Sequence, residues 1–125
     1  MPKVDVVAFQ EADGRAPLLS WIDDLVPLAR AKCLVRLARL AELGHELRRP
    51  EADHLGEGLY ELGVKHQRVN LRMLYFFHGE CAVVVSHGFR KQRSSVPQSE
   101  LALARWRRRL FEASPEAHTY QGEVD

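Results

Sequence analysis

Residues 59–89 read LYELGVKHQRVNLRMLYFFHGECAVVVSHGF, and this stretch decides the fold. It contains three runs rich in β-branched, aromatic and aliphatic residues, at 59–66, 69–77 and 81–89, separated by joints of two or three residues. Runs of this composition predict β-strands. Because joints this short permit only hairpins, we expect the three strands to form an antiparallel meander.

The residues around the meander predict helices and one further strand. The predicted elements are a strand at 4–9, a short helix opened by Pro17, a helix at 28–43 closed by Gly44, a polar link at 45–58, and a last helix that begins at Pro97. The expected order is β-α-α-β-β-β-α, a single α+β domain over residues 1–113. Residues 114–125 show no periodicity and are expected to form a flexible acidic tail, which we hypothesise covers the basic face.

The first hairpin joint predicts which residues face each other. A two-residue loop at 67–68 sets Gly63 opposite Arg72 and Tyr60 opposite Tyr75. These pairs fix which side chains of the first two meander strands share a face.

The second joint predicts another set of neighbours. A two-residue loop at 79–80 pairs His78 with Cys81 and sets Arg72 opposite His87. Since side chains alternate along a strand, one face is then expected to carry Arg72, Leu74 and Phe76 beside Val83, Val85 and His87.

The net charge of +1 hides an uneven distribution along the 125 residues. Residues 1–61 carry 8 basic and 11 acidic groups, residues 62–111 carry 10 basic and 2 acidic groups, and residues 112–125 carry 4 acidic groups and no basic ones. The central block, net +8, favours a polyanion or an acidic protein as partner on one face. Charges that merely cluster on a solvated surface are the alternative interpretation.

The basic residues of the block gather near strand ends and in the loop after the third meander strand. They are Lys65, His66, Arg68, Arg72, His87, Arg90, Lys91 and Arg93. Aromatic residues such as Tyr60, Tyr75 and Phe89 interleave with them, a composition that single-stranded nucleic-acid sites use. Aromatic residues on strands also serve as core, so both interpretations stay open.

Arg72 stands among apolar residues of the central strand. A buried arginine is costly unless it has an anionic partner or reaches solvent. Arg72 is therefore expected either to form a salt bridge, for instance to Glu61, or to bind a phosphate.

Several function classes find no support in the sequence. Cys33 and Cys81 make neither a CxxC nor a zinc spacing, which favours small core residues in a reducing cytoplasm. HExxH, P-loop, GxGxxG and nucleophile-elbow motifs are absent, so we expect no metal or nucleotide cofactor. No stretch approaches the about 20 apolar residues of a membrane span, and the first residues do not match a signal peptide.

Four motifs follow one another along the chain. They are GLYEL at 58–62, Arg72 followed by Tyr75, HGF followed by Lys91, and Pro97 followed by Glu100, Leu101 and Ala104. Together they resemble the RelE/ParE toxin superfamily, in its phage-derived HigB-type branch. The resemblance covers residues 17–112.

The resemblance implies a fold, a partner and an activity. The fold is the RelE-like β-α-α-β-β-β-α domain, located in the cytoplasm. The system is a type II toxin–antitoxin pair whose antitoxin carries a helix-turn-helix. The activity is ribosome-dependent cleavage of messenger RNA, in which a ribose 2′-hydroxyl attacks the adjacent phosphate without a metal cofactor.

The resemblance also implies roles for the basic residues. Arg72 would stabilise the pentacoordinate phosphate, assisted by Lys65 and Lys91. His87 or His66 would shuttle a proton, and Tyr75 would orient the RNA or stack on a base. The remaining cations, Arg68, Arg90 and Arg93, would hold RNA together with His66.

Three positions depart from the family pattern. Gly63 stands where the family has an arginine, Gln92 replaces a lysine, and Val96 replaces a threonine that would cap the last helix. The first two departures keep open a non-catalytic RNA- or protein-binding member of the fold. ParE-like inhibition of DNA gyrase, in which the same fold acts on another target, is a further alternative.

Overall fold

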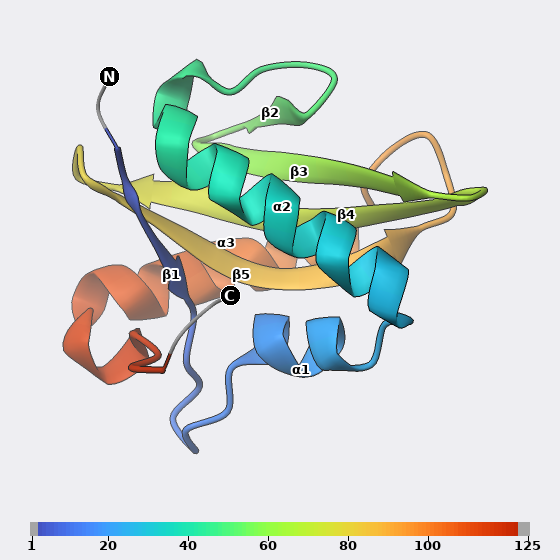
Figure 1. The fold of residues 1–125 in the computed structure, drawn as a ribbon. Helices are drawn as coiled ribbons and strands as arrows, with labels where there is room; N and C mark the ends of the chain where they lie inside the picture. Colours follow the sequence, from blue (N-terminus) through green and yellow to red (C-terminus); the bar gives the residue numbers. More distant parts are fainter. Residues whose placement is uncertain (1–2, 123–125) are drawn as a thin grey trace.

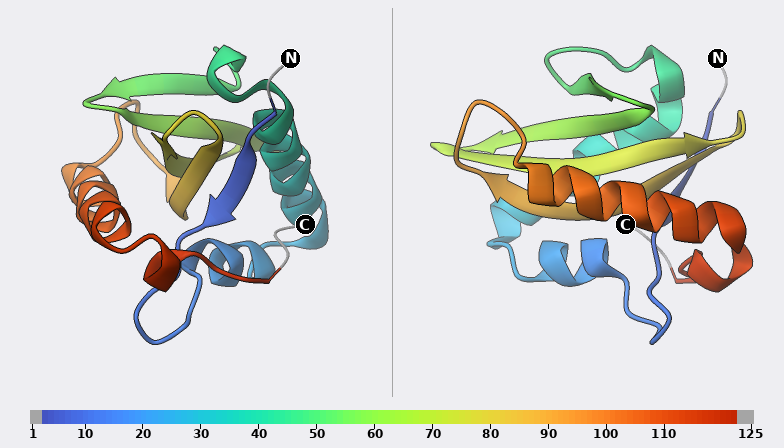
Figure 2. Two further views of the ribbon diagram at one scale, coloured as in Figure 1. Left: turned by 90° about the vertical axis from the view of Figure 1, so that its left-hand side faces the viewer. Right: turned by 180° about the vertical axis from the view of Figure 1, so that it is seen from behind.

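The computed structural model describes residues 3–122 and confirms an α+β fold built on one five-stranded sheet (Figure 1). In chain order the elements are β1 (Asp5–Ala8), α1 (Pro17–Asp23), α2 (Pro27–Leu43), the 3₁₀ turn η1 (Gly44–Glu46), β2 (Ala52–Gly56), β3 (Leu59–His66), β4 (Val69–His78), β5 (Ala82–Lys91), α3 (Gln98–Ala113) and the 3₁₀ turn η2 (Glu116–His118). Helices α1 and α2 cover one face of the sheet and α3 covers the other, which makes three layers (Figure 2).

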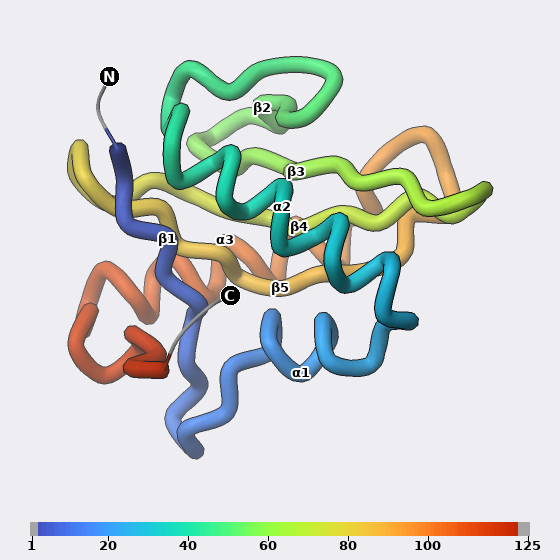
Figure 3. The backbone as a smooth tube through the Cα atoms, in the orientation of Figure 1, coloured from blue at the N-terminus to red at the C-terminus, as the bar shows by residue number. Residues whose placement is uncertain are grey.

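The sheet has the order β1-β5-β4-β3-β2. The predicted meander β3-β4-β5 is confirmed, and β1 adds a parallel pair along β5. Strand β2, which pairs with β3, lies in the stretch that the sequence indicated as a polar link (Figure 3). Its five residues include Asp53 and His54 and contain a register shift before Gly56, so they show no apolar alternation.

The register between β3 and β4 agrees with the prediction. Gly63 pairs with Arg72 and Tyr60 pairs with Tyr75. The loop has the expected two residues, and Gln67 adopts a positive φ of 56°, which a tight hairpin requires.

The predicted register between β4 and β5 is wrong. His78 pairs with Ala82, so the loop has three residues, and a register shift follows between Leu74 and Tyr75. Arg72 therefore faces Phe89, and His87 faces Leu74. The extra loop residue also moves Val83 and Val85 to the α1/α2 face, whereas the shift brings His87 back to the α3 face.

The helices begin where proline permits. Pro17 and Pro27 occupy the first helical positions of α1 and α2, and α3 starts directly after Pro97. Gly44 ends α2 with a positive φ of 53°. Among residues 3–122, none of the helices is long and apolar enough to cross a membrane.

The segment after α3 makes contacts that the sequence does not indicate. Thr119 forms a bridge with Phe9, the Tyr120 amide donates to the Ala8 carbonyl at 3.1 Å, and the His118 ring stacks on Phe9. These contacts place residues 115–120 beside β1. The flexibility of the tail stays a prediction, and its last three residues lie outside the described part of the chain.

One glycine sets how closely α1 approaches the sheet. The Trp21 indole lies directly over Gly88 of β5, so that a Cβ built on Gly88 would stand 2.2 Å from the nearest ring carbon. No L-residue with a side chain fits there without moving the ring. Gly88 therefore allows the close packing of α1 on β5.

We expect Gly88→Ala to lower the free energy of unfolding by about 1–3 kcal/mol, because the methyl group overpacks this contact. Urea unfolding of the purified protein measures the loss. If the clash with the indole is the cause, Trp21→Leu will make the effect of Gly88→Ala smaller in a double-mutant cycle. Additive effects would contradict this explanation.

Candidate active site

Three cross-strand rows of side chains lie next to one another on the α3 face of the sheet. Alternation from the buried Leu59, Leu74 and Phe89 assigns them to this face. The rows, each taken from β3, β4 and β5, are Lys65–Asn70–Lys91, Gly63–Arg72–Phe89 and Glu61–Leu74–His87. The meander thus brings the predicted catalytic residues Lys65, Arg72 and Lys91 into adjacent rows.

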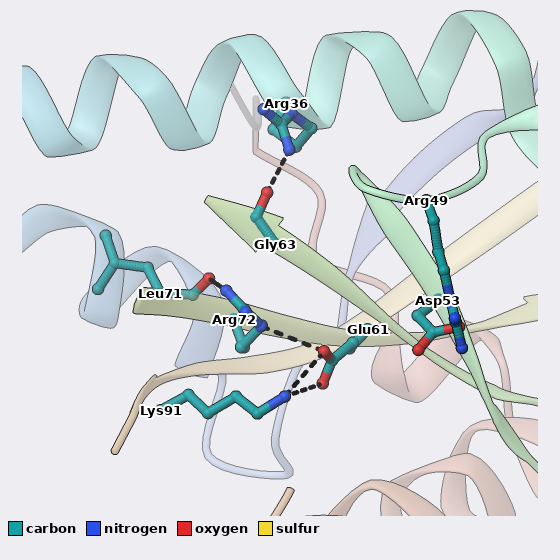
Figure 4. Close-up of polar contacts among 8 residues, drawn as sticks. All are labelled: Arg36, Arg49, Asp53, Glu61, Gly63, Leu71, Arg72 and Lys91. Atoms are coloured by element: carbon teal, nitrogen blue, oxygen red, sulfur yellow. Dashed lines mark hydrogen bonds and ion pairs between the residues drawn. The ribbon is translucent and has the colours of Figure 1, made fainter. Parts of the chain in front are cut away.

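Glu61 joins two of these cations (Figure 4). Its Oε1 accepts a hydrogen bond from Arg72 Nε at 3.1 Å and lies 3.2 Å from Lys91 Nζ. Arg72 also donates from Nη1 to the Leu71 carbonyl at 3.0 Å. Of the two interpretations for Arg72, the structure shows the salt bridge to Glu61. The same carboxylate also pairs with Lys91.

The three charged groups are largely shielded from water. The side chains of Glu61, Lys91 and Arg72 are 9%, 11% and 19% exposed. Shielded charges of opposite sign attract strongly, and each would be costly to bury alone. One carboxylate against two cations leaves one positive charge in excess, so the cluster can still attract an anion.

Gly63 has a spatial role beside this cluster. A Cβ at position 63 would lie 3.2 Å from Arg72 Nη1 and 3.4 Å from its Cζ. The guanidinium of Arg72 therefore fills space directly against the glycine. The position that lacks the family's arginine is where the arginine of the neighbouring strand packs.

His87 lies on the same face but beneath α3. Its Nε2 is 2.8 Å from Glu100 Oε1, and its Nδ1 is 2.8 Å from Ser86 Oγ. A neutral ring satisfies both contacts if Nε2–H donates to Glu100 and the Ser86 hydroxyl donates to Nδ1. Ser86 is fully buried and His87 is only 6% exposed, so this chain of hydrogen bonds anchors α3 and offers no accessible nucleophile.

The other predicted residues do not join the cluster. Tyr75 is buried in the core on the α1/α2 face, and this burial raises the pKa of its hydroxyl above the usual range. His66 is buried on that same face, and its Nδ1 has no hydrogen-bond partner within residues 3–122. The exposed cations Arg68, Arg90 and Arg93 lie in the β3–β4 turn, near the end of β5 and in the loop before α3.

Within the described residues, no group of three or more His, Cys, Asp or Glu side chains is placed to hold a metal ion. The cluster itself consists of one carboxylate and two cations. It can attract a phosphate, stabilise charge that develops on it, and exchange protons between Glu61 and Lys91.

Comparison with known families assigns the chain. A family model described as phage derived protein Gp49-like (DUF891) matches residues 20–109, most of the chain. The chain belongs to this Gp49-like family. The family is known for RelE/ParE-like toxins. A search among curated proteins found no match.

Two residues of this Gp49-like protein come to the site only through the tertiary structure. Arg36 of α2 donates to the Gly63 carbonyl, and Glu51 lies 3.5 Å from Arg36 Nε and accepts from Arg39. Both residues lie outside the +8 block. The helical periodicity predicts that Arg36 lies on the solvent-facing side of its helix. It does not indicate that this side contacts β3.

We expect the stability of the protein to fall between pH 7.5 and 5.5, partly through His87. Burial lowers the pKa of His87 below its usual 6.5; the hydrogen bond that His87 donates to Glu100 opposes this shift, and the charge of Arg107 adds to it. Below about pH 6.5 the unfolded chain therefore binds a proton at His87 that the folded protein binds only at lower pH. The loss begins as pH falls through about 6.5 and amounts to about 1.4 kcal/mol for each pH unit between the two pKa values.

Melting curves of the wild type and His87→Gln across this pH range measure the effect. The variant cannot titrate at position 87, so its melting temperature should depend less steeply on pH. His54→Gln, at an exposed histidine, serves as control and should keep the wild-type slope. Equal slopes for all three proteins would contradict the assignment.

Proposed function

We propose that this protein is the toxin of a type II toxin–antitoxin system, of the HigB-type branch, and that it cleaves messenger RNA on the ribosome in the cytoplasm. Its partner would be a helix-turn-helix antitoxin that covers the basic face. The observation that carries the proposal is the shielded cluster of Glu61, Arg72 and Lys91 on one face of the meander, with Lys65 in the adjacent row. Membership of the Gp49-like family supports it.

The cluster suggests a division of labour in the cleavage step. Arg72 and Lys91 would stabilise the extra negative charge of the pentacoordinate phosphate. Glu61 would take the proton of the attacking 2′-hydroxyl, and Lys91 would give a proton to the leaving 5′-oxygen. The products are a 2′,3′-cyclic phosphate and a 5′-hydroxyl. Transfer of the proton from Glu61 to Lys91, 3.2 Å away, would restore both groups.

This mechanism departs from the roles that the resemblance implies for His87 and Tyr75. Both side chains are buried, His87 under α3 and Tyr75 on the opposite face of the sheet. Glu61 is also shielded from water, but its carboxylate contacts both Arg72 and Lys91 and lines a narrow cleft of about 30 Å³ together with Gly63 and Arg72. We therefore assign the acid–base role to the carboxylate, which lies directly against the two cations.

We expect Arg72→Ala to reduce cleavage of messenger RNA on programmed ribosomes by about 100- to 1000-fold and to abolish toxicity. Mapping RNA 5′ ends after induction, together with the purified reaction, measures both effects. Arg105→Ala removes the same charge from an arginine of α3 that pairs with the exposed Glu57, and it should retain activity. Circular dichroism checks the fold of both variants.

Full toxicity of Arg72→Ala would show that this cluster is not the active site. If the wild type halts growth without A-site cleavage and gyrase cleavage complexes accumulate, the protein acts as a ParE-like gyrase inhibitor instead.

Glu61→Gln should separate binding from cleavage. The amide keeps the size of the side chain but neither accepts the 2′-hydroxyl proton nor neutralises Arg72 and Lys91. We expect RNA to bind about 2- to 10-fold more tightly, since a charge-assisted contact is worth about 1 kcal/mol or more, while the cleavage rate falls by at least 100-fold. Glu57→Gln, on the exposed side chain, should leave both quantities unchanged.

A non-catalytic member of the fold is the second candidate, because Glu61 already pairs with both cations that would meet the phosphate. It predicts salt-dependent RNA binding by the wild type with no cleavage on programmed ribosomes. In that case Glu61→Gln would tighten binding, and no variant would change a cleavage rate. Detection of A-site cleavage by the wild type removes this candidate.

A further inference from the structure

The edge of β3 is open beyond its contact with β2. The two strands pair from Gly56 and Leu59 to Ala52 and Leu62, and one further hydrogen bond joins the Gly63 amide to the Glu51 carbonyl at 2.8 Å. The last residues of β3, 64–66, have no partner on β2. Beyond Gly63 this edge of β3 therefore makes no ladder hydrogen bonds with β2.

A hollow of about 280 Å³ occupies this open edge. Arg36 reaches it from α2, Lys65 from β3, and Asn70 and Arg72 from β4. It shares Gly63 and Arg72 as walls with the narrow cleft that contains Glu61. The hollow and the Glu61 cluster thus adjoin through Gly63 and Arg72, and Figure 4 shows these two residues between Arg36 and Glu61.

The charges around the hollow do not balance. Three cations, Arg36, Lys65 and Arg72, line the hollow, and two more, Arg39 and Lys91, contact the carboxylates beside it. These two carboxylates, Glu51 and Glu61, are both already paired. Glu51 accepts two hydrogen bonds from Arg39, at 2.9 and 2.7 Å, and Glu61 holds Arg72 and Lys91. The neighbouring Arg49–Asp53 pair adds no net charge. An excess of three positive charges around a concave surface attracts a polyanion.

Arg72 retains donors for a ligand. A guanidinium carries five N–H bonds. Within the described residues, Arg72 uses Nε–H toward Glu61 and one Nη1–H toward the Leu71 carbonyl. The N–H bonds of Nη2 make no hydrogen bond to the protein there, so they can contact a phosphate oxygen without loss of the salt bridge.

Gly63 keeps the hollow open. Because position 63 has no side chain, Arg72 packs against the strand and space is left above it. A longer side chain at this position would occupy the wall that the hollow and the cleft share. The absence of the family's arginine therefore creates room for a ligand at the same time as it removes a charge.

We propose that this hollow binds a second phosphate of the RNA strand, next to the phosphate at the Glu61 cluster, and that Arg36 is an RNA-contacting residue. Arg36 and Lys65 flank this phosphate, and the Asn70 amide offers both a donor and an acceptor to the attached nucleotide. The inference rests on the proposed function because it takes RNA as the ligand. Its tests measure binding to free RNA, and the proposed cleavage needs the ribosome, so either proposal can fail alone.

Nuclear magnetic resonance on the ¹⁵N-labelled wild type tests the place of binding. The probes are a six-nucleotide single-stranded RNA, uridine 3′-monophosphate and inorganic phosphate. We expect the RNA to shift the backbone amides of residues 63–65 and the side-chain amide of Asn70 at the lowest concentration, followed by the nucleotide and then phosphate. RNA-induced shifts that avoid these signals would overturn the proposal. Equal effects of RNA and phosphate would reduce the site to a general anion site and would also overturn it.

Substitution of Arg36 tests its contribution. We expect Arg36→Gln to weaken RNA binding by about 3- to 10-fold, the worth of one charged contact. The slope of log K against log salt should become less steep by about 0.7, the value for one phosphate contact with a single strand. Arg109→Gln removes the same charge from an exposed part of α3 and should change neither.

Arg36 also donates to the Gly63 carbonyl, so Arg36→Lys provides a second variant that keeps the charge. This variant should retain the wild-type salt slope. If Arg36→Gln unfolds, the proposal then stands or falls on the slope of Arg36→Lys and on the wild-type resonance shifts. Binding of Arg36→Gln equal to that of Arg109→Gln, with both proteins folded, would overturn it.

Discussion

The arrangement of this protein's charged residues depends on one carboxylate, Glu61, placed between Arg72 and Lys91. The three residues come from β3, β4 and β5, so the ion cluster ties the strands of the meander together on the α3 face. Burying either cation this far from water without an anionic partner would cost free energy. Glu61 is that partner for both Arg72 and Lys91. The same contacts hold Arg72 and Lys91 near each other, which is what a phosphate-binding site requires.

The sheet divides the +8 block into two surfaces. Because neighbouring residues on a strand point to opposite faces, Lys65 and Lys91 lie on the α3 face, whereas His66 and Arg90 lie on the α1/α2 face. Only part of the block can therefore meet one phosphate. A further cation, Arg36, comes from the acidic half of the sequence and reaches the edge of β3 from α2, where it donates to the Gly63 carbonyl.

The predictable parts of the fold are those set by local rules. The pairing of Gly63 with Arg72 follows from a two-residue loop, and the helix starts at Pro17 and Pro27 follow from the geometry of proline. The predicted pairing of Arg72 with His87 is wrong, because the β4–β5 loop has one more residue than expected and the register between the two strands shifts between Leu74 and Tyr75. Strand β2 cannot be predicted from its sequence, because this short, partly polar segment shows no alternation and forms a strand only by pairing with β3.

The sequence by itself determined the α+β class, the antiparallel meander, the family motifs and the place of Arg72 in the central meander strand opposite Gly63, because periodicity, loop length and composition act over a few neighbouring residues. Only the tertiary structure decided that Glu61 clamps Arg72 and Lys91, that His87 and Tyr75 are buried away from them, and that Arg36 reaches Gly63. These relations join residues from different elements. They depend on how the helices pack on the sheet and on one register shift, and no local pattern in the chain encodes either.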